Sequence, residues 1–177
     1  MAGLVLAAGS GTRYGQPKAP VVIDGERLVD RAARLLREAG CDPVVVVLGA
    51  WVGDVPDAEV ALNADWAEGM GSSLRVGLTA LEKRAEVDRA VITLVDLPGL
   101  TAEAIHRVMA CPDDIVIATY DADRGHPVIF ARKHWDAICE HAHGDQGARG
   151  FLRERRDITL VEVGDIAQGY DLDEPIE

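Results

Sequence analysis

The sequence predicts a three-layer α/β/α sandwich with a mostly parallel central sheet. Two continuous apolar runs rich in β-branched residues, at 43–48 and 89–95, have the composition of strands buried on both faces of a sheet. Between such runs, leucines and alanines recur at helical spacing. Strands that alternate with helices form a parallel sheet covered by helices on both faces, and ligands of such sheets bind at the carboxyl ends of the strands.

The elements are expected in the following order. A short buried strand at 4–8 comes first, and a small strand with an Asp-Gly turn occupies 20–26. The helix that follows carries apolar residues at helical spacing and ends at Gly40. Thr101 has the position and the hydroxyl of a helix N-cap. The remaining segments are expected as strands at 43–48, 60–62, 89–95, 115–119, 127–130 and 159–163, and as helices at about 72–83, 102–110, 133–141 and 147–155.

Composition limits the classes of partner. The 177 residues are 48% hydrophobic and 27% charged, which is enough for a well-buried core, and a single domain spanning 1–177 is expected. A net charge of −12 would repel nucleic acid and anionic membranes, so neither partner is expected. No stretch approaches the ~20 apolar residues of a membrane span, and no secretion signal is evident. The three cysteines are widely spaced, which suits reduced thiols and predicts a cytoplasmic protein.

The loop after the first strand has the composition of a phosphate site. Residues 6–18 read Leu-Ala-Ala-Gly-Ser-Gly-Thr-Arg-Tyr-Gly-Gln-Pro-Lys. Glycines let backbone amides turn toward an anion, and Arg13 and Lys18 supply positive charge. The loop is not a P-loop, because Lys18 follows Pro17 instead of opening a helix. It is not a dinucleotide fingerprint either, because Tyr14 stands where the third glycine would be.

Carboxylates at two other places are candidates for a metal site. Asp96 comes directly after the strand at 89–95 and is held by Pro98, so it is placed to bind a divalent cation. A capping role is the alternative, but Thr101 already fills it. Asp171 and Asp173, in the acidic tail, are two further acids of which one could reach the same ion. Ser72 and Ser73, at the start of a predicted helix, are expected to offer free amides to an anion.

These segments resemble a known family. The loop at 6–18 resembles the signature loop of nucleotidyltransferases that activate small molecules with an NTP. Later segments resemble the molybdenum cofactor cytidylyltransferase (MocA-like) branch of the MobA-like NTP transferase superfamily. The resemblance implies a Rossmann-like fold of the nucleotide-diphospho-sugar transferase type. Its later motifs are Asn-x-x-Trp-x-x-Gly-x-x-x-Ser-Leu at 63–74, Leu-x-Asp-Leu-Pro at 94–98, Gly-His-Pro at 125–127, Gly-Asp-Gln-Gly-Ala-Arg at 144–149 and Asp-Leu-Asp-Glu-Pro at 171–175.

The resemblance also implies roles for individual residues. Catalytic roles fall on Arg13, Lys18 and Asp96. Magnesium is expected at Asp96 and Asp171, with Asp173 open as the alternative second ligand. Without the resemblance, Trp66 and His126 would be interpreted as packed or surface residues. The implied nucleotide-binding residues are Leu6, Ala7, Ala8, Gly9, Ser10, Gly11, Lys18, Ser72 and Ser73, and the implied acceptor-binding residues are Trp66, His126, Asp145 and Arg149.

The function expected on these grounds is transfer of CMP from CTP to the phosphate of molybdenum-molybdopterin, with release of pyrophosphate. In family terms, Ala7-Ala8-Gly9 goes with CTP, whereas glycine at the middle position goes with GTP. Two alternatives stay open: transfer from GTP or CTP to another phosphorylated acceptor, and a non-catalytic accessory protein of molybdoenzyme maturation. The presence of Arg13, Lys18 and Asp96 favours catalysis, because binding alone does not need an acid and two cations around one phosphate. A client molybdoenzyme is an expected partner.

Overall fold

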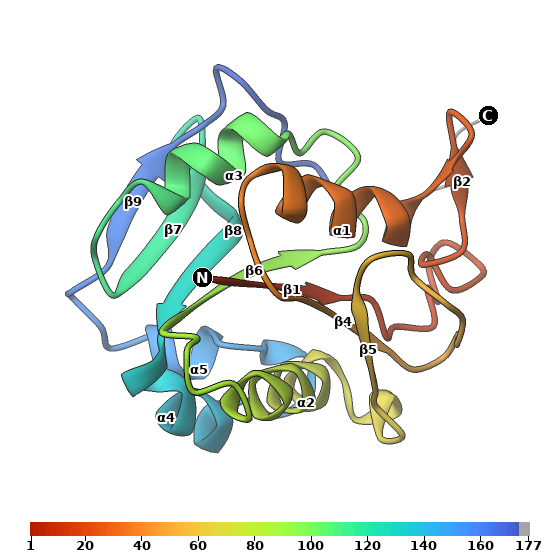
Figure 1. The fold of residues 1–177 in the computed structure, drawn as a ribbon, viewed down its shortest axis with the longest axis horizontal. Helices are drawn as coiled ribbons and strands as arrows, with labels where there is room; N and C mark the ends of the chain where they lie inside the picture. The colour runs from red at the N-terminus through yellow and green to blue at the C-terminus, as the bar shows by residue number, and fades with distance from the viewer. Residues whose placement is uncertain (174–177) are drawn as a thin grey trace.

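In residues 1–173, which the computed structural model describes, seven strands form one central sheet (Figure 1). The end of the Asp-Leu-Asp-Glu-Pro motif, at 174–175, lies outside the described residues. The sheet order is β5-β4-β1-β6-β8-β7-β9. In chain order the strands are β1 (Ala2–Leu6), β4 (Val44–Leu48), β5 (Glu59–Leu62), β6 (Arg89–Leu94), β7 (Ile115–Tyr120), β8 (Asp123–Ala131) and β9 (Thr159–Glu162).

Helices cover both faces of this sheet, which confirms the predicted three layers. Helices α1 (Leu28–Glu38) and α3 (Ala102–Met109) lie on one face in Figure 1. Helices α2 (Met70–Glu82), α4 (Trp135–His141) and α5 (Arg149–Leu152) lie on the other. Short 3-10 turns occur at η1 (Trp66–Glu68), η2 (Arg132–His134) and η3 (Gly144–Gln146). None of the helices in the described part of the chain is long and apolar enough to cross a membrane.

The sheet is mostly parallel, as predicted. β8 runs antiparallel to its neighbours β6 and β7, and the other pairs in the sheet are parallel. β1 lies between β4 and β6, with Leu6 in register with Val47 on one side and Leu94 on the other. The carboxyl ends of three central strands therefore meet at one edge, where ligands of such sheets bind.

Each face of the sheet has its own apolar core. Val5, Val46 and Leu36 belong to the core under α1 and α3, whereas Leu4 and Leu78 belong to the core against α2. Successive residues of a strand point to opposite faces, so a strand between two helical layers needs apolar side chains at every position. The continuous apolar runs in the sequence reflect this requirement.

Two turns confirm predictions that depended on backbone conformation. The small strand at 20–26 is a hairpin of β2 (Val22–Ile23) and β3 (Glu26–Arg27), in which Asp24 and Gly25 have φ of 53° and 83°. Gly40, with φ of 98°, follows α1. The Cys41 amide donates to Leu36 O at 2.9 Å, and the Gly40 amide donates to Arg37 O at 2.9 Å. This is the Schellman arrangement, which ends a helix at a glycine in the left-handed region.

Several predicted boundaries are wrong, among them those of the first strand, expected at 4–8 and observed as β1 at Ala2–Leu6. β8 begins at Asp123, four residues before the expected strand at 127–130, because its exposed polar first half pairs with the end of β7. The helix expected at 147–155 is only α5, since Gly147 has φ of 51°, a left-handed conformation that a helix interior excludes. The helix expected at 72–83 begins two residues earlier, at Met70.

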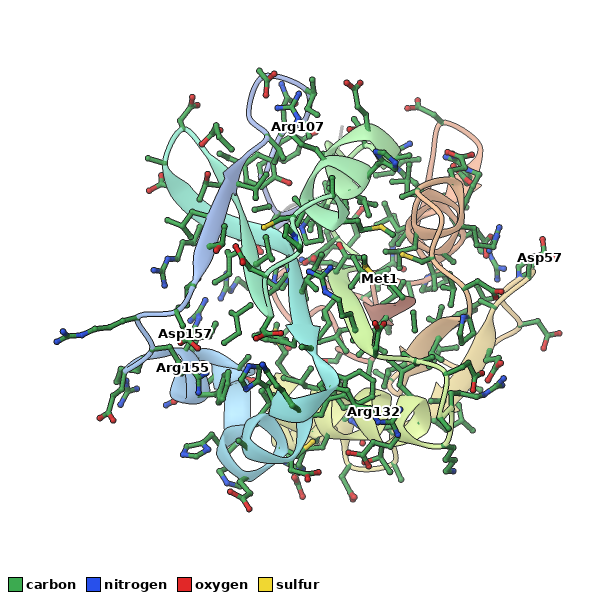
Figure 2. The ribbon with its side chains drawn as sticks, turned by 60° about the vertical axis from the view of Figure 1, so that its left-hand side comes forward. Met1, Asp57, Arg107, Arg132, Arg155 and Asp157 are labelled. Atoms are coloured by element: carbon green, nitrogen blue, oxygen red, sulfur yellow. The ribbon has the colours of Figure 1, made fainter. Side chains whose placement is uncertain are left out.

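Arginine side chains join several elements at the surface (Figure 2). Arg132 donates to Glu82 O at 2.6 Å and to Arg84 O at 2.7 Å. Glu82 is the last residue of α2, where helix carbonyls lack partners, and Arg84 lies two residues beyond it, so Arg132 binds the end of the helix and complements its dipole. Arg155 and Asp157, also labelled in Figure 2, form an ion pair at 2.6 Å.

Candidate active site

The loop that follows β1 leaves the sheet between its neighbours β4 and β6. The Ala7 amide donates to Val47 O at 3.0 Å, and the Val95 amide donates to Leu6 O at 3.2 Å. These bonds extend the pairing of the three strands by one residue. The loop therefore starts at the carboxyl edge of the sheet, where the sequence predicts a ligand site.

Gly11 fixes the shape of this loop. Its φ is 63°, and a Cβ at this position would lie 1.8 Å from Gln16 O, so no other residue fits. The Gly15 amide donates to Gly11 O at 2.7 Å and closes the turn. The Cβ position of Gly9, by contrast, meets no heavy atom within 4 Å. Gly11 thus makes the chain double back, which brings Lys18 to the edge of the sheet.

Lys18 and Asp96 form the centre of the site. Lys18 Nζ donates to Asp96 Oδ2 at 2.7 Å, and the two side chains are only 12% and 18% exposed. Lys18 Nζ also lies 3.6 Å from Asp173 Oδ1. A charge-assisted bond shielded from water holds the ammonium in a defined place more firmly than a surface pair would. The loop cation and the strand carboxylate, predicted separately, therefore meet in one site.

Arg13 lies at the outside of the same cluster. Its guanidinium Nη1 is 3.3 Å from Asp173 Oδ2, and its side chain is 82% exposed. An exposed ion pair of this kind contributes little to stability, because water competes for both partners. Arg13 can therefore exchange Asp173 for a bound anion at small cost in free energy.

The acidic tail is anchored beside Asp96 by Leu172. The Leu172 amide donates to Asp96 O at 2.9 Å, and its buried side chain packs against Leu28. Asp171 and Asp173 flank this anchor. Partial burial raises the pKa of Asp171, and the negative charges of Asp96 and Asp173 raise it further. The three carboxylates are thus close enough to repel one another, a repulsion that a bound cation would relieve.

These carboxylates fit Mg²⁺ that is shared with a phosphate. They supply hard oxygen donors, and Mg²⁺ takes only one or two protein carboxylates, with water and phosphate oxygens completing its shell. Among residues 1–173, no three or more His, Cys, Asp or Glu side chains are already grouped as a metal site. Whether Asp171 or Asp173 is the second ligand stays a prediction.

A cavity of about 390 Å³ opens in front of the loop. This volume is within the range of ligand sites, roughly 300–1,000 Å³. Its walls contain Lys18, Asp96, Trp66, Asp145 and every predicted nucleotide-binding residue except Ser72. Arg13 does not line it. Six lining residues were not singled out from the sequence, although all of them lie within or next to the motifs quoted above: Thr12, Ala67, Gly69, Met70, Leu94 and Val95.

The amide and the hydroxyl of Ser72 are both hydrogen-bonded at the start of α2. Because α2 starts at Met70, the Ser72 amide lies inside the first turn and donates to Gly69 O at 3.2 Å. Its hydroxyl also donates to Gly69 O, at 2.8 Å, and it accepts from Asn63 Nδ2, at 2.8 Å. The expectation of a free amide at Ser72 is therefore wrong. Asn63 Nδ2 also donates to Ser73 Oγ at 3.0 Å, and Ser73 does line the cavity.

Two predicted acceptor residues reach the cavity because distant segments pack together. Gly69 has φ of 109°, and a Cβ there would lie 2.5 Å from Asp145 Oδ1. The η3 turn can therefore approach the segment between η1 and α2 only because residue 69 is glycine. This contact brings Asp145 to the same cavity as Trp66.

His126 and Arg149 are near the site but do not line the cavity. His126, in β8, has its Nδ1 3.3 Å from Ile92 O. Burial lowers the pKa of His126, and the hydrogen bond to Ile92 O and the charge of Asp96 only partly oppose this. His126 is therefore neutral at pH 7 and is a poor candidate for binding phosphate by charge. Arg149 is exposed at the start of α5, and its role in acceptor binding stays a prediction.

Comparison with known proteins gives consistent matches. Residues 3–159 match the family described as MobA-like NTP transferase domain. "Nicotine blue oxidoreductase" of Paenarthrobacter nicotinovorans is 34% identical over 97% of this chain and 91% of that protein. A "probable molybdenum cofactor guanylyltransferase" of Opitutus terrae is 35% identical over 58% of this chain and half of that protein.

The fold has solved counterparts. The crystal structure of the Mycobacterium tuberculosis Rv0371c homologue from Mycobacterium sp. strain JC1 superposes with a TM-score of 0.82 at 27% identity. The match covers 96% of this chain and 89% of that one. The loop, the cavity and the sheet edge described above therefore lie within a known architecture.

Proposed function

This chain belongs to the MobA-like NTP transferase family and is a nucleotidyltransferase, and we propose that it transfers CMP from CTP to the phosphate of molybdenum-molybdopterin, with release of pyrophosphate. The observation that carries the proposal is the position of Lys18. Its ammonium, bound to Asp96 at 2.7 Å, lies in the wall of the cavity that the glycine loop also lines. A cation held beside backbone amides and a carboxylate is suited to an NTP with its metal.

The proposed reaction needs no protein nucleophile. An oxygen of the acceptor phosphate forms a bond to the α-phosphorus of CTP, and the bond from that phosphorus to the α,β-bridging oxygen breaks. Pyrophosphate leaves with the bridging oxygen and its electron pair. A phosphate monoester is already largely an anion at neutral pH, because its second pKa is about 6, so no general base is required. Catalysis then consists of positioning and of stabilising charge on the transferring group.

The site residues divide this work. Lys18 is held in place by Asp96 and acts on the charge that develops on the transferred phosphate. Arg13, which is exposed and only weakly held by Asp173, moves to the leaving pyrophosphate. Mg²⁺, held by Asp96 with Asp171 or Asp173, would supply further positive charge at the triphosphate when it is bound. Gly11 maintains the turn of the loop, which lines the cavity together with Lys18.

The identities of donor and acceptor rest on two observations. The donor is inferred as CTP because Ala8 carries a Cβ where the resemblance associates glycine with GTP. The Ala8 methyl group is buried close to Trp66. Both residues adjoin Gly49, where an added Cβ would lie 2.9 Å from Ala8 Cβ and 2.6 Å from Trp66 Cβ. Because Trp66 lines the cavity, this methyl group restricts the room for a purine. The acceptor is inferred from the motifs quoted above and from the name of the Opitutus terrae relative, which refers to the molybdenum cofactor.

Pyrophosphate release tests the proposal directly. The purified protein is given molybdenum-molybdopterin and one of CTP, GTP, ATP or UTP, and the product is identified by mass spectrometry. We expect release with CTP and acceptor together, little release without acceptor, and a product heavier than the acceptor by one CMP moiety. Binding of CTP without turnover would instead support the non-catalytic accessory role. Turnover with a different phosphorylated acceptor would support nucleotidyl transfer as the reaction but would replace molybdenum-molybdopterin as the acceptor.

Redox activity is a second candidate, because the relative that matches nearly the whole chain is named an oxidoreductase. The measurement is bleaching of nicotine blue with NADH or NADPH, in the presence and absence of CTP. Pyrophosphate release separates the two functions, because nucleotidyl transfer releases pyrophosphate and reduction of a dye by NADH or NADPH does not. Bleaching by the wild type, together with no pyrophosphate release, would favour the redox function.

A further inference from the structure

β5 forms one of the two edges of the central sheet, and β9 forms the other. β5 is the last strand in the sheet order and pairs only with β4 among the described residues. Val60 and Leu62, on this strand, are 39% and 60% exposed. Unpaired strand edges with apolar side chains are usually covered or charged in monomeric proteins, because they add further strands readily. The exposure of this edge therefore requires an explanation.

The backbone of β5 can accept a further strand. The Asn63 amide donates to Leu48 O at 2.8 Å and so faces β4. Alternate residues of a strand turn their amides to the same side. The Ala61 amide therefore also faces β4, and the amides of Val60 and Leu62 face outward. These two residues combine outward hydrogen-bonding groups with exposed apolar side chains.

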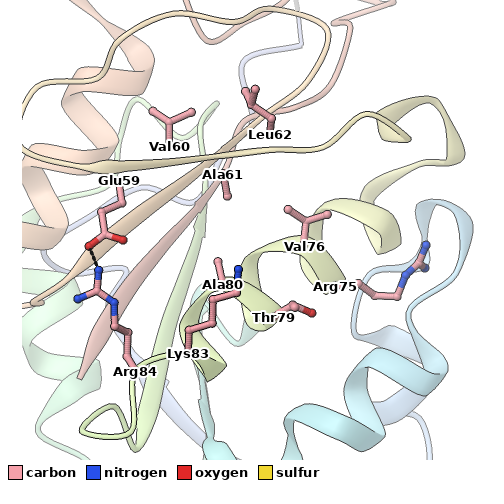
Figure 3. Close-up of a pocket in the computed structure, with 10 residues that line it drawn as sticks. All are labelled: Glu59, Val60, Ala61, Leu62, Arg75, Val76, Thr79, Ala80, Lys83 and Arg84. Carbon is pink, nitrogen blue, oxygen red and sulfur yellow. Dashed lines mark hydrogen bonds and ion pairs between the residues drawn. The ribbon is translucent and has the colours of Figure 1, made fainter.

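A groove lies between this strand and α2 (Figure 3). It has a volume of about 580 Å³. In Figure 3 Ala61 projects toward α2, and Val60 and Leu62 project to the opposite side of the strand. Thr79 of α2 and Lys83, the residue that follows α2, line the groove and are exposed. An added strand would thus meet apolar side chains on one face and the polar surface of α2 on the other.

Three basic residues and one acidic residue, Glu59, line the groove, although the chain as a whole carries a net charge of −12. Arg75, Lys83 and Arg84 all line it. Arg84 pairs with Glu59, and Arg75 pairs with Glu68 at 2.8 Å. Lys83 has no ion-pair partner in residues 1–173. The ammonium of Lys83 is therefore free to bind a carboxylate of a partner.

The same charges argue against a second copy of this chain as the occupant. Two β5 strands paired edge to edge would place two copies of α2 side by side, each with its positive rim toward the other. Each copy would also bring a net charge of −12. Like charges placed opposite each other across a sheet are destabilising. A strand that carries acids on one face avoids this repulsion.

We propose that the outer edge of β5, with the groove along α2, binds an extended segment of a partner protein in which apolar and acidic residues alternate. The segment adds as a strand. Its apolar side chains contact Val60 and Leu62, and its acids face Lys83. α2 also provides Met70 and Ser73 to the wall of the catalytic cavity. The docked partner therefore lies along the helix that shapes the active site, as suits a protein that supplies the acceptor or receives the product.

A synthetic peptide tests the proposal without enzymatic activity. The probe is a fluorescent eight-residue peptide of alternating glutamate and valine, and the measurement is its anisotropy against increasing protein. We expect saturable binding that weakens as salt is raised, because screening reduces attraction between exposed charges. A peptide of alternating lysine and valine should bind at least tenfold more weakly. Hydrogen exchange should show protection of the Val60 and Leu62 amides when the acidic peptide is bound.

Variants separate the two parts of the surface. Lys83→Glu should weaken the acidic peptide about tenfold or more. Arg156→Glu makes the same change of charge at an exposed site near β9, at the opposite edge of the sheet, and should have little effect. Val60→Pro removes an outward amide without removing a bond to β4 and should abolish binding. Unchanged thermal unfolding and pyrophosphate release would show that these variants are folded.

Three outcomes would overturn the proposal. The first is equal binding of the acidic and basic peptides, and the second is no binding of the acidic peptide at millimolar concentration. The third is a concentration-dependent dimer, seen by analytical ultracentrifugation, that Val60→Pro abolishes, since this would assign the edge to a second copy. None of these outcomes depends on the identity of the transferred nucleotide, so the proposed reaction can fail while this inference stands.

Discussion

Lys18 is the side chain on which the proposed chemistry depends most. Lys18→Ala should lower kcat by a factor on the order of 10²–10³, the usual effect of losing one preorganised stabilising donor. KM for CTP should change less, because the loop amides and Arg13 remain. Steady-state pyrophosphate release gives both constants, and Lys133→Ala, on a distant surface, is the control. An unchanged kcat with a raised KM would assign Lys18 to substrate binding alone.

Ala8 is expected to control the choice of base. Ala8→Gly should raise kcat/KM for GTP relative to CTP, because loss of the methyl group gives room beside Trp66. Ala118→Gly is the control: Ala118 is also buried in a strand of the sheet but does not line the cavity, so it should not change the ratio. The measurement is competition between the two nucleotides in one reaction. A wild-type preference for GTP of more than tenfold would show that the donor is assigned wrongly.

Asp96 is expected to serve the metal. Asp96→Asn is isosteric, so the fold should persist, but the amide is a poor ligand for Mg²⁺ and turnover should nearly vanish at any practical magnesium concentration. Asp171→Asn should behave alike, with Asp173→Asn milder. Calorimetry with CTP gives a second readout. In Asp96→Asn the affinity for Mg²⁺ should fall. The affinity for CTP without metal should stay the same or rise, because Lys18 loses its ion-pair partner and can bind the triphosphate instead. A rate within about threefold of wild type, less than ~1 kcal/mol of barrier, would place the metal elsewhere.

At the scale of elements, the β7–β8 turn is held by one carboxylate. Glu162, at the end of β9, accepts from Thr119 Oγ1 at 2.8 Å and from the amides of Gly164, Asp121 and Ala122. The hydrogen bond from Thr119, followed by that from the Gly164 amide, lowers the pKa of Glu162 to about 2. Asp121 and Ala122 have φ of 51° and 72°, a conformation that non-glycine residues seldom adopt, so the turn depends on these contacts.

The consequence is a dependence of stability on pH. A carboxyl group whose pKa is lower in the folded state than in the unfolded state stabilises the folded protein. This stabilisation is complete at pH values above the unfolded-state pKa, near 4.5, and it is lost as the pH falls toward the folded-state pKa, about 2. Glu162→Gln should therefore reduce the free energy of unfolding at pH 7, and the difference from wild type should shrink below about pH 4.5. Urea unfolding at several pH values measures this. Glu154→Gln, at an exposed position, is the control, and a constant difference across the pH range would contradict the account.

At the scale of the whole molecule, the cavity is built by segments distant in sequence. Its walls include Gly9, Trp66, Asp96 and Asp145, and the tail at 171–173 packs beside it. The unfolded chain cannot bring these segments together, so a ligand of the cavity binds only the folded state. At a free concentration one hundred times Kd, CTP with Mg²⁺ should stabilise the fold by about 2.7 kcal/mol and raise Tm by roughly 5–10 °C. Calorimetry of CTP with and without Mg²⁺ checks this, and no shift would argue against a nucleotide site.

The sequence by itself determined the elements and their layers. A strand covered on both faces must be apolar at every position, so the runs at 43–48 and 89–95 could belong only to the interior of the sheet, and β4 and β6 confirm them. Gly40 marks the end of a helix because its backbone is in the left-handed region, which favours glycine. Thr101 marks the start of a helix because its hydroxyl accepts a hydrogen bond from the Ala104 amide at 3.1 Å. The conformation at each of these positions depends on residues only a few places away along the chain, so it can be predicted from the sequence.

Only the tertiary structure decided which side chains meet. Lys18 and Asp96 are 78 residues apart, and their contact at 2.7 Å exists because β1 and β6 are adjacent in the sheet. The sequence names Asp171 as the second metal ligand and Asp173 as the alternative, but the directions of both side chains depend on Leu172, whose burial beside Asp96 turns Asp173 toward Lys18 and Arg13. Local pattern sets the conformation of a segment, whereas the partners of its side chains depend on strand order and on packing across the whole chain.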